Sequence, residues 1–174
     1  IALSKITDTG LFEHLATAVL RAARPELYGN LTQPGINAEG KPIQSPVDAV
    51  AFVPGSNPPH MVAAHHTTQD DLRKKWLHDP STVTPRKGAK SAAPAGDLLK
   101  TAGIVNEERT KTPGLRVTLA LTTNEEPAED VTREAERTAL SYGIVLDIWS
   151  RSRIANYLDN DPNGQWLRRK YLRI

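Results

Sequence analysis

The sequence predicts an α/β fold, with a mixed central sheet of about five strands flanked by helices on both faces. Two observations lead to this prediction. Residues 47–67 contain two short apolar stretches separated by a turn rich in Pro, Gly and Asn, which is typical of an antiparallel hairpin. Residues 115–149 contain a strand pattern, a helix pattern and a second strand pattern, and a connection of that length favours a parallel pair of strands.

Length and composition narrow the class of protein. The chain has 174 residues, of which 39% are hydrophobic and 24% charged, and this suits one globular domain over residues 1–174. It has no cysteine, no signal segment, and no apolar run of the roughly 18 residues that a membrane span needs. We therefore expect a cytoplasmic protein without a membrane partner. Because the sequence begins with Ile1, we also expect a domain excised from a longer chain that carries further domains.

The first expected element is a helix over Leu11–Arg24. Asp8 or Thr9 is suited to cap its start, and Pro25 is expected to stop it. The helix is amphipathic, because its apolar side chains recur with helical spacing on one arc, at Phe12, Leu15, Ala16, Val19 and Ala23.

The later elements follow from patterns of the same kinds. Residues 29–46 are rich in Gly and Pro, and they predict turns around a short strand near residues 30–33. Residues 79–96 are basic and lack periodicity, so they predict a loop that is mobile without a ligand. The remaining predictions are strands at 47–53, 61–67, 115–123 and 144–149, and helices at 68–77 (capped by Thr68), 97–108, 127–142 (capped by Asn124), 152–158 and 164–171.

Basic residues are concentrated in two parts of the chain. Residues 71–116 hold ten Lys or Arg against five Asp or Glu, and residues 149–174 hold six against two, whereas residues 117–148 hold two against seven. A segregated basic surface can attract a polyanion such as DNA. The alternative is that these segments are solvated helix faces and that the loop at 79–96 is a passive linker.

An aspartate lies inside the otherwise apolar strand predicted at 47–53. Because a buried carboxylate without partners is costly, Asp48 requires polar neighbours. His65 and Thr67 on the next strand share one face and can supply them. A carboxylate with an imidazole suits Mn²⁺ or Zn²⁺ better than Mg²⁺. The alternative is that Asp48 and His65 are hydrogen-bonded residues at strand ends, with no ligand.

Two helical residues could complete such a centre. Glu13 on the first helix could face the same pocket, and Lys75 lies nearer to the apolar arc of Leu72 and Trp76 than Lys74 does. The aliphatic stem of Lys75 could therefore run inward. For both residues, exposure to solvent is the commoner outcome.

The order of these residues resembles the PD-(D/E)xK, or restriction-endonuclease-like, superfamily, and within it the Mrr-like branch and the nuclease-like N-terminal modules of bacterial defence proteins. The resemblance covers residues 11–15 as the first helix, 46–48 as the proline–aspartate step, 61–68 as the second active-site strand, and 115–149 as the closing strand–helix–strand unit. Where the superfamily has Glu-x-Lys, this chain has His65-His66-Thr67. Lys75 on the following helix is therefore the candidate substitute for the lysine.

The resemblance implies a metal-dependent DNA endonuclease that hydrolyses phosphodiesters. A divalent metal, Mg²⁺ or Mn²⁺, would be held by Asp48, His65 and Glu13, with Thr67 and Lys75 joining Asp48 and His65 as catalytic residues. DNA would be contacted by Lys74, Arg86, Lys87 and Lys90, and a homodimer is left open. The alternative is a catalytically inactive nuclease fold that serves a larger defence protein as a recognition module for nucleic acid or protein.

Overall fold

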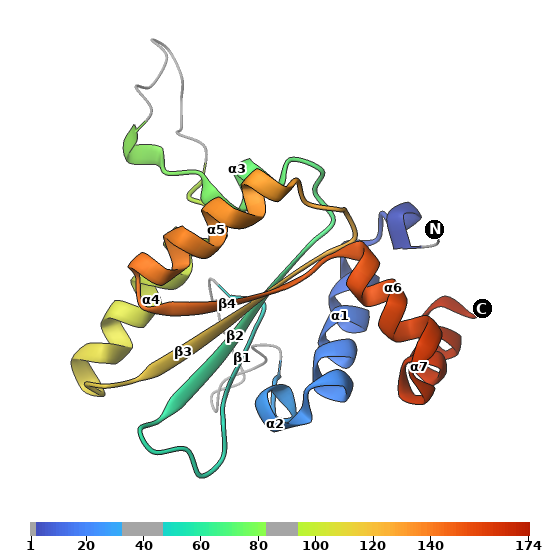
Figure 1. Cartoon of the computed structure of the whole chain (residues 1–174), viewed down its shortest axis with the longest axis horizontal. Coiled ribbons are helices and arrows are strands. Elements are labelled where there is room, and N and C mark those ends of the chain that lie inside the picture. The colour runs from blue at the N-terminus through green and yellow to red at the C-terminus, as the bar shows by residue number, and fades with distance from the viewer. Residues whose placement is uncertain (1–2, 33–46, 83–93) are drawn as a thin grey trace, which may run out of the picture.

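A four-stranded mixed sheet is the centre of the structure. The computed structural model describes residues 3–32, 47–82 and 94–174. Within these ranges the strands are β1 (Ala49–Phe52), β2 (His60–Thr67), β3 (Arg116–Thr123) and β4 (Ile144–Trp149), in the order β1-β2-β3-β4 (Figure 1). β1 and β2 pair antiparallel, whereas β2, β3 and β4 are mutually parallel. The α/β class, the mixed sheet, the hairpin and the parallel crossover are thus confirmed.

The expected count of about five strands is wrong for the described part of the chain. The stretch near residues 30–33 contributes only a single bridge, in which Thr32 pairs with Val50 on β1. Before this bridge the chain lies in a turn, because the Leu31 N–H donates a hydrogen bond to the Tyr28 carbonyl.

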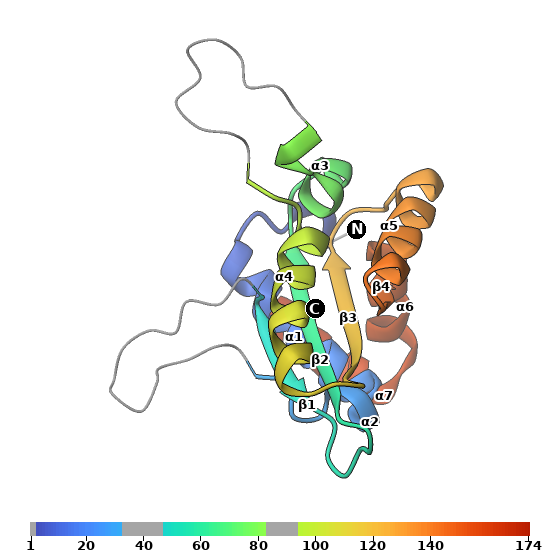
Figure 2. The ribbon, with the colours of Figure 1, turned by 90° about the vertical axis from the view of Figure 1, so that its left-hand side faces the viewer.

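Helices cover both faces of the sheet, as the sequence predicts (Figures 1 and 2). On one face α1, α6 and α7 pack over one apolar cluster, and on the other α3, α4 and α5 pack over a second. The bounds of the helices are α1 (Thr9–Ala23), α2 (Pro25–Tyr28), α3 (Leu72–Leu77), α4 (Asp97–Lys111), α5 (Glu129–Ser141), α6 (Arg151–Asn160) and α7 (Pro162–Leu172), with 3-10 turns at Leu3–Lys5 and Pro80–Thr82.

The capping residues differ from expectation at two helices. Asp8 caps α1 as predicted, but α3 is capped by Asp71, whose side chain accepts a hydrogen bond from the Lys74 N–H, and not by Thr68. No side chain caps α5, which begins after Ala128. Asn124 instead donates hydrogen bonds to the carbonyls of Leu3 and Ile6, because the turn that precedes α5 packs against the N-terminal segment.

One arginine connects the residues that precede the two strands of the strand–helix–strand unit. Arg109, near the end of α4, donates hydrogen bonds to the carbonyls of Tyr142, Gly143 and Leu115, which lie at the entrances to β4 and β3. Gly143 adopts a φ of +69°, a conformation that side chains with a Cβ rarely take. A short turn between α5 and β4 is the result, as the Gly predicts.

Among the described residues, no helix is both long and apolar enough to cross a membrane.

Candidate functional site

Asp48 lies immediately before β1, beside the carboxyl end of β2. Its backbone N–H donates to the Ala64 carbonyl at 2.9 Å, and its Oδ2 accepts a hydrogen bond from the His66 N–H at 2.7 Å. The pairing of Ala49 with Ala64, continued by one residue, places Asp48 opposite His65. The sequence argument that Asp48 requires polar neighbours is therefore met by the backbone of β2 and by His65.

His65 is buried on the face of the sheet that α3, α4 and α5 cover. Its Nε2 lies 3.1 Å from Thr101 Oγ1, and that hydroxyl donates to the Asp97 carbonyl at 2.8 Å. With the hydroxyl proton directed at that carbonyl, Nε2 would carry the imidazole proton and Nδ1, 3.5 Å from Asp97 Oδ1, would keep its lone pair. Burial lowers the pKa of His65 to about 4, against a smaller opposite effect of Asp48, so His65 is neutral at pH 7.

Asp97 is the residue on which this cluster converges, although the sequence did not single it out. Only 1% of its side chain is exposed, and its Oδ1 lies 3.2 Å from Lys75 Nζ and 3.5 Å from His65 Nδ1. Among the described residues, Asp97 Oδ2 has no hydrogen-bond partner. Burial raises the pKa of Asp97, while Lys75 and Lys100 oppose that rise.

Gly96 explains how Asp97 comes to lie against Lys75. Its N–H donates to the His78 carbonyl at 2.7 Å, which joins the start of α4 to the end of α3. A Cβ at this position would lie 2.6 Å from the Trp76 carbonyl oxygen, so only glycine permits this approach. The sequence feature that accompanies the burial of Asp97 is therefore a Gly-Asp pair at the start of a helix. This pair alone does not reveal that α3 and α4 pack together.

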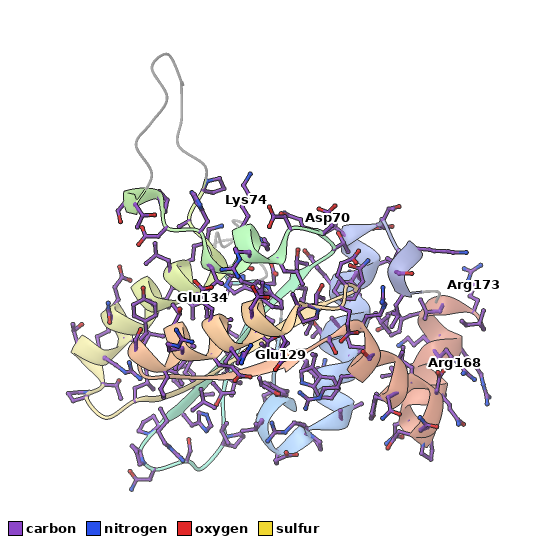
Figure 3. The ribbon with its side chains drawn as sticks, turned by 45° about the horizontal axis from the view of Figure 1, so that its top comes forward. Asp70, Lys74, Glu129, Glu134, Arg168 and Arg173 are labelled. Atoms are coloured by element: carbon purple, nitrogen blue, oxygen red, sulfur yellow. The ribbon has the colours of Figure 1, made fainter. Side chains whose placement is uncertain are left out.

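Lys75 points inward, which is the less common of the two outcomes that the sequence left open for it. Its side chain is 24% exposed and forms an ion pair with the buried Asp97. Lys74, its neighbour, is exposed and points away from the helix (Figure 3). The two adjacent lysines of α3 therefore have different environments.

Glu13 on α1 belongs to the same neighbourhood. Burial and the nearby charge of Asp48 raise the pKa of Glu13, whereas Lys75 lowers it. Glu13 is thus connected with Asp48 and Lys75 through its charge, although α1 covers the face of the sheet opposite to α3. We refer to Glu13, Asp48, His65, Lys75 and Asp97 as the acid–lysine centre.

Other predicted residues lie outside this centre or cannot be placed. Thr67 Oγ1 accepts a hydrogen bond from the Gln69 N–H at 3.0 Å, which closes the turn after β2. His66 faces the opposite side of the sheet, where it bonds to Thr17 and Thr122, and burial lowers its pKa to about 3. Arg86, Lys87 and Lys90 and most of the loop at 79–96 lie outside the described residues.

The donors of the centre suit a divalent cation that shares its ligands with water or substrate. Asp48 and Glu13 offer carboxylates from separate elements and His65 one imidazole nitrogen, whereas Asp97, whose Oδ2 has no partner among the described residues, is the counter-ion of Lys75. Within the described ranges, no three His, Asp or Glu side chains are arranged to hold an ion by themselves. Mg²⁺ is commonly bound by one or two carboxylates together with waters and substrate phosphates, so the residues fit this kind of site.

Comparisons of the chain with protein-family models, with curated proteins and with solved structures give no match. The acid–lysine centre lies beside β2, the strand that pairs antiparallel with β1 and parallel with β3.

Proposed function

We propose that this chain has a restriction-endonuclease-like fold and hydrolyses DNA phosphodiesters with the help of a divalent metal. The observation that supports this most is the inward position of Lys75. The lysine is held by the buried Asp97 at 3.2 Å and lies close enough to Glu13 and His65 to alter their pKa values. In this proposal Lys75, from the following helix, would take the part of the Glu-x-Lys lysine that the sequence lacks.

The residues of the centre then have separate roles. Asp48 and Glu13 would hold the cation with the lone pair of His65 Nδ1, and a bound cation would polarise the phosphate and acidify water. Lys75 supplies a positive charge near the phosphate oxygens. Asp97 keeps the ammonium group of Lys75 at this position, and Thr101 orients His65.

A plasmid-nicking assay with Mg²⁺ and with Mn²⁺ tests the proposal. Asp48→Asn keeps a side-chain oxygen that can accept from the His66 N–H, so it is less disruptive than alanine. We expect this variant and Lys75→Ala to lose cleavage, and Arg137→Ala, which removes an exposed arginine of α5, to keep the rate of the unaltered protein. Equal nicking by the unaltered protein and Asp48→Asn would overturn the assignment of the site.

A second candidate function is recognition of nucleic acid, or of a protein partner, without cleavage, within a larger defence protein. It is favoured by the commitment of Asp48 Oδ2 and His65 Nε2 to internal hydrogen bonds, and by the threonine at position 67. This candidate predicts salt-dependent binding to DNA that is unchanged by a chelator. Fluorescence anisotropy with labelled DNA, with and without EDTA, distinguishes it from the nuclease when the nicking assay is run in parallel.

A further inference from the structure

A cavity lies at the amino ends of β3 and β4, away from the acid–lysine centre. Its volume is about 520 Å³, within the range of roughly 300–1,000 Å³ found for small-molecule sites. β2 connects the two places, since its first residue, His60, lines the cavity, while His65 near its other end belongs to the centre. A strand rises about 3.3 Å per residue, so these residues are about 16 Å apart along the sheet.

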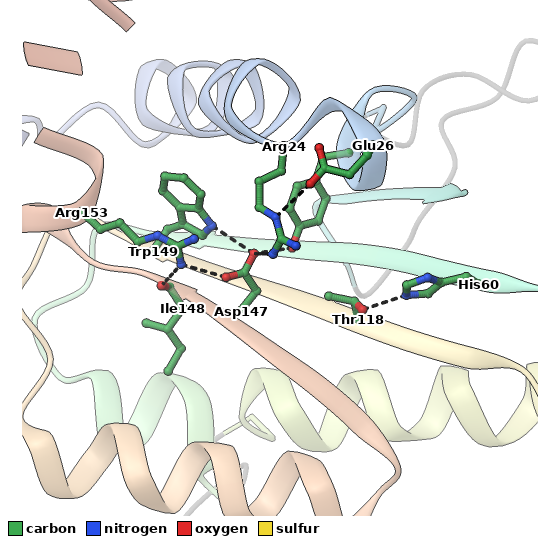
Figure 4. A network of polar contacts seen from close by, with 9 residues as sticks. Arg24, Glu26, His60, Thr118, Asp147, Ile148, Trp149 and Arg153 are labelled. Carbon is green, nitrogen blue, oxygen red and sulfur yellow. Dashed lines mark hydrogen bonds and ion pairs between the residues drawn. The ribbon is translucent and has the colours of Figure 1, made fainter. Parts of the chain in front are cut away.

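The sheet changes character where this cavity opens. Under α1, α6 and α7 this face of β2 and β3 carries the apolar Val62, Ala64 and Ala120, followed by the hydrogen-bonded pair His66 and Thr122. Toward the amino ends the same face instead carries His60 and Thr118, whose Nε2 and Oγ1 atoms lie 2.8 Å apart (Figure 4). The floor of the cavity is therefore polar and can form hydrogen bonds with a ligand.

The walls combine apolar side chains with positive charge. Leu27, Val145 and Leu146 line the cavity, and Val145 is 62% exposed, unusual for an aliphatic side chain on a sheet. An apolar ligand surface laid over Val145 would remove it from water, which is favourable in proportion to the buried area.

The charges that face the cavity do not cancel. Asp147 is bonded to Arg24 and Arg153 as well as to Tyr28 and Trp149, so its negative charge is already compensated (Figure 4). Arg109 and Arg116 also line the cavity, and among the described residues their hydrogen bonds go to backbone carbonyls and not to carboxylates. The cavity therefore carries a surplus of positive charge.

The two arginines contribute differently. Arg109 uses most of its N–H groups on the carbonyls of Leu115, Tyr142 and Gly143, so it supplies mainly a fixed positive potential. Arg116 is exposed, and among the described residues its guanidinium donates one hydrogen bond, to the Pro58 carbonyl at 3.4 Å, which leaves it able to turn toward an anion. Arginine suits phosphate, because its planar fork can donate two parallel hydrogen bonds.

We propose that this cavity binds a nucleotide. The phosphate faces Arg116 within the positive potential of Arg109, the base lies against Leu27 and Val145, and His60 and Thr118 offer hydrogen bonds to its polar edge. This assignment does not depend on the proposed nuclease activity, since the cavity shares no residue with the acid–lysine centre.

Isothermal titration calorimetry at low salt tests the proposal with three probes: AMP, adenosine and inorganic phosphate. We expect AMP to bind. Adenosine and phosphate should each bind at least about tenfold more weakly, because adenosine lacks the phosphate that faces Arg116 and phosphate lacks the base that lies against Leu27 and Val145. Arg116→Ala should weaken AMP binding about tenfold or more, the effect of losing a charge-assisted hydrogen bond. Arg137→Ala, which removes an exposed arginine of α5 outside the cavity, should leave it unchanged.

Three results would overturn the proposal. They are the absence of AMP binding at millimolar concentration, AMP binding that Arg116→Ala does not weaken, and phosphate binding as tight as that of AMP, which would indicate a bare anion site. Arg116→Ala is expected to fold, since its side chain makes one long hydrogen bond, and circular dichroism verifies this.

Discussion

The ammonium group of Lys75 lies 3.2 Å from Oδ1 of Asp97, a carboxylate whose side chain is only 1% exposed. The contact joins the short helix α3 to the first residue of α4, and it places a positive charge next to the neutral imidazole of His65. A buried charge of this kind is tolerated only while its partner is present.

Removal of Lys75 is therefore expected to destabilise the protein more than removal of Lys74. Lys75→Ala leaves Asp97 buried without its cation, at a cost of about 3 kcal/mol in the free energy of unfolding near pH 7. Lys74→Ala should change it by less than about 0.5 kcal/mol, because that side chain is exposed. Urea unfolding measures both. The deficit of Lys75→Ala should shrink on acidification, as Asp97 takes up a proton; a deficit independent of pH would contradict the ion pair.

The pH dependence of stability should reflect the two buried histidines. Burial lowers the pKa of His65 to about 4 and that of His66 to about 3, from 6.5. The unfolded chain therefore binds more protons below pH 6.5, so stability is greatest above that value and falls as the pH drops toward 4 and then 3. The loss is on the order of 3 kcal/mol per histidine. The raised pKa of Asp97 acts in the opposite direction, which reduces the slope at acid pH.

His66→Gln should flatten this profile. Glutamine can still donate to and accept from Thr17 and Thr122, but it does not titrate. Unfolding experiments from pH 7.5 to 4.5 compare the slopes of the two proteins. An unchanged slope would show that His66 is not a source of the acid sensitivity.

Two glycines of the α4 region should respond in opposite directions to alanine. Gly96→Ala places a Cβ 2.6 Å from the Trp76 carbonyl oxygen, so α3 and α4 must separate, which should cost about 1–3 kcal/mol. Gly103→Ala, inside the same helix, meets no atom within 4 Å and should stabilise the protein by about 0.5–1 kcal/mol. Thermal unfolding distinguishes the two signs; tolerance of Gly96→Ala would contradict the close approach of the helices.

Asp147 should be the acid whose loss is most costly on the other face of the sheet. Burial opposes its ionisation, but hydrogen bonds from Tyr28, Arg153 and Trp149 outweigh it and hold the pKa of Asp147 below its usual value. Asp147→Ala leaves these donors unpaired and should cost about 3 kcal/mol. Asp159→Ala, which removes an exposed partner of Arg168, should cost less than about 1 kcal/mol. Chemical denaturation at pH 7 compares them.

The sequence predicted the elements whose patterns are local. The helix expected at 11–24 is found at Thr9–Ala23, and the strand expected at 144–149 is found at Ile144–Trp149. Caps were less predictable, since Thr68 and Asp71 are both suitable residues and the chain path after β2 decides between them. The expected fifth strand is represented, in the part of the chain that the structure describes, by the single bridge between Thr32 and Val50.

The candidate site could be predicted only in part for a similar reason. Asp48 and His65 were recognisable as candidates because polar residues are unusual in apolar strands, whereas the helix face of Lys75 left both an inward position and solvent exposure open. Asp97 was not recognisable, because an aspartate in the first turn of a helix is ordinarily exposed. It is buried here through a contact between two helices that Gly96 permits, and no local pattern records that contact.

Arg109 has a consequence for the register of the parallel strands β3 and β4. Its guanidinium holds the carbonyls of Leu115, Tyr142 and Gly143, which precede β3 and β4. A slip of β4 by one residue along β3 would carry Gly143 away from Arg109 and would turn the apolar side chains of β4 to the wrong face. One side chain near the end of a helix thus fixes the starts of both strands relative to each other, independently of the packing of their side chains.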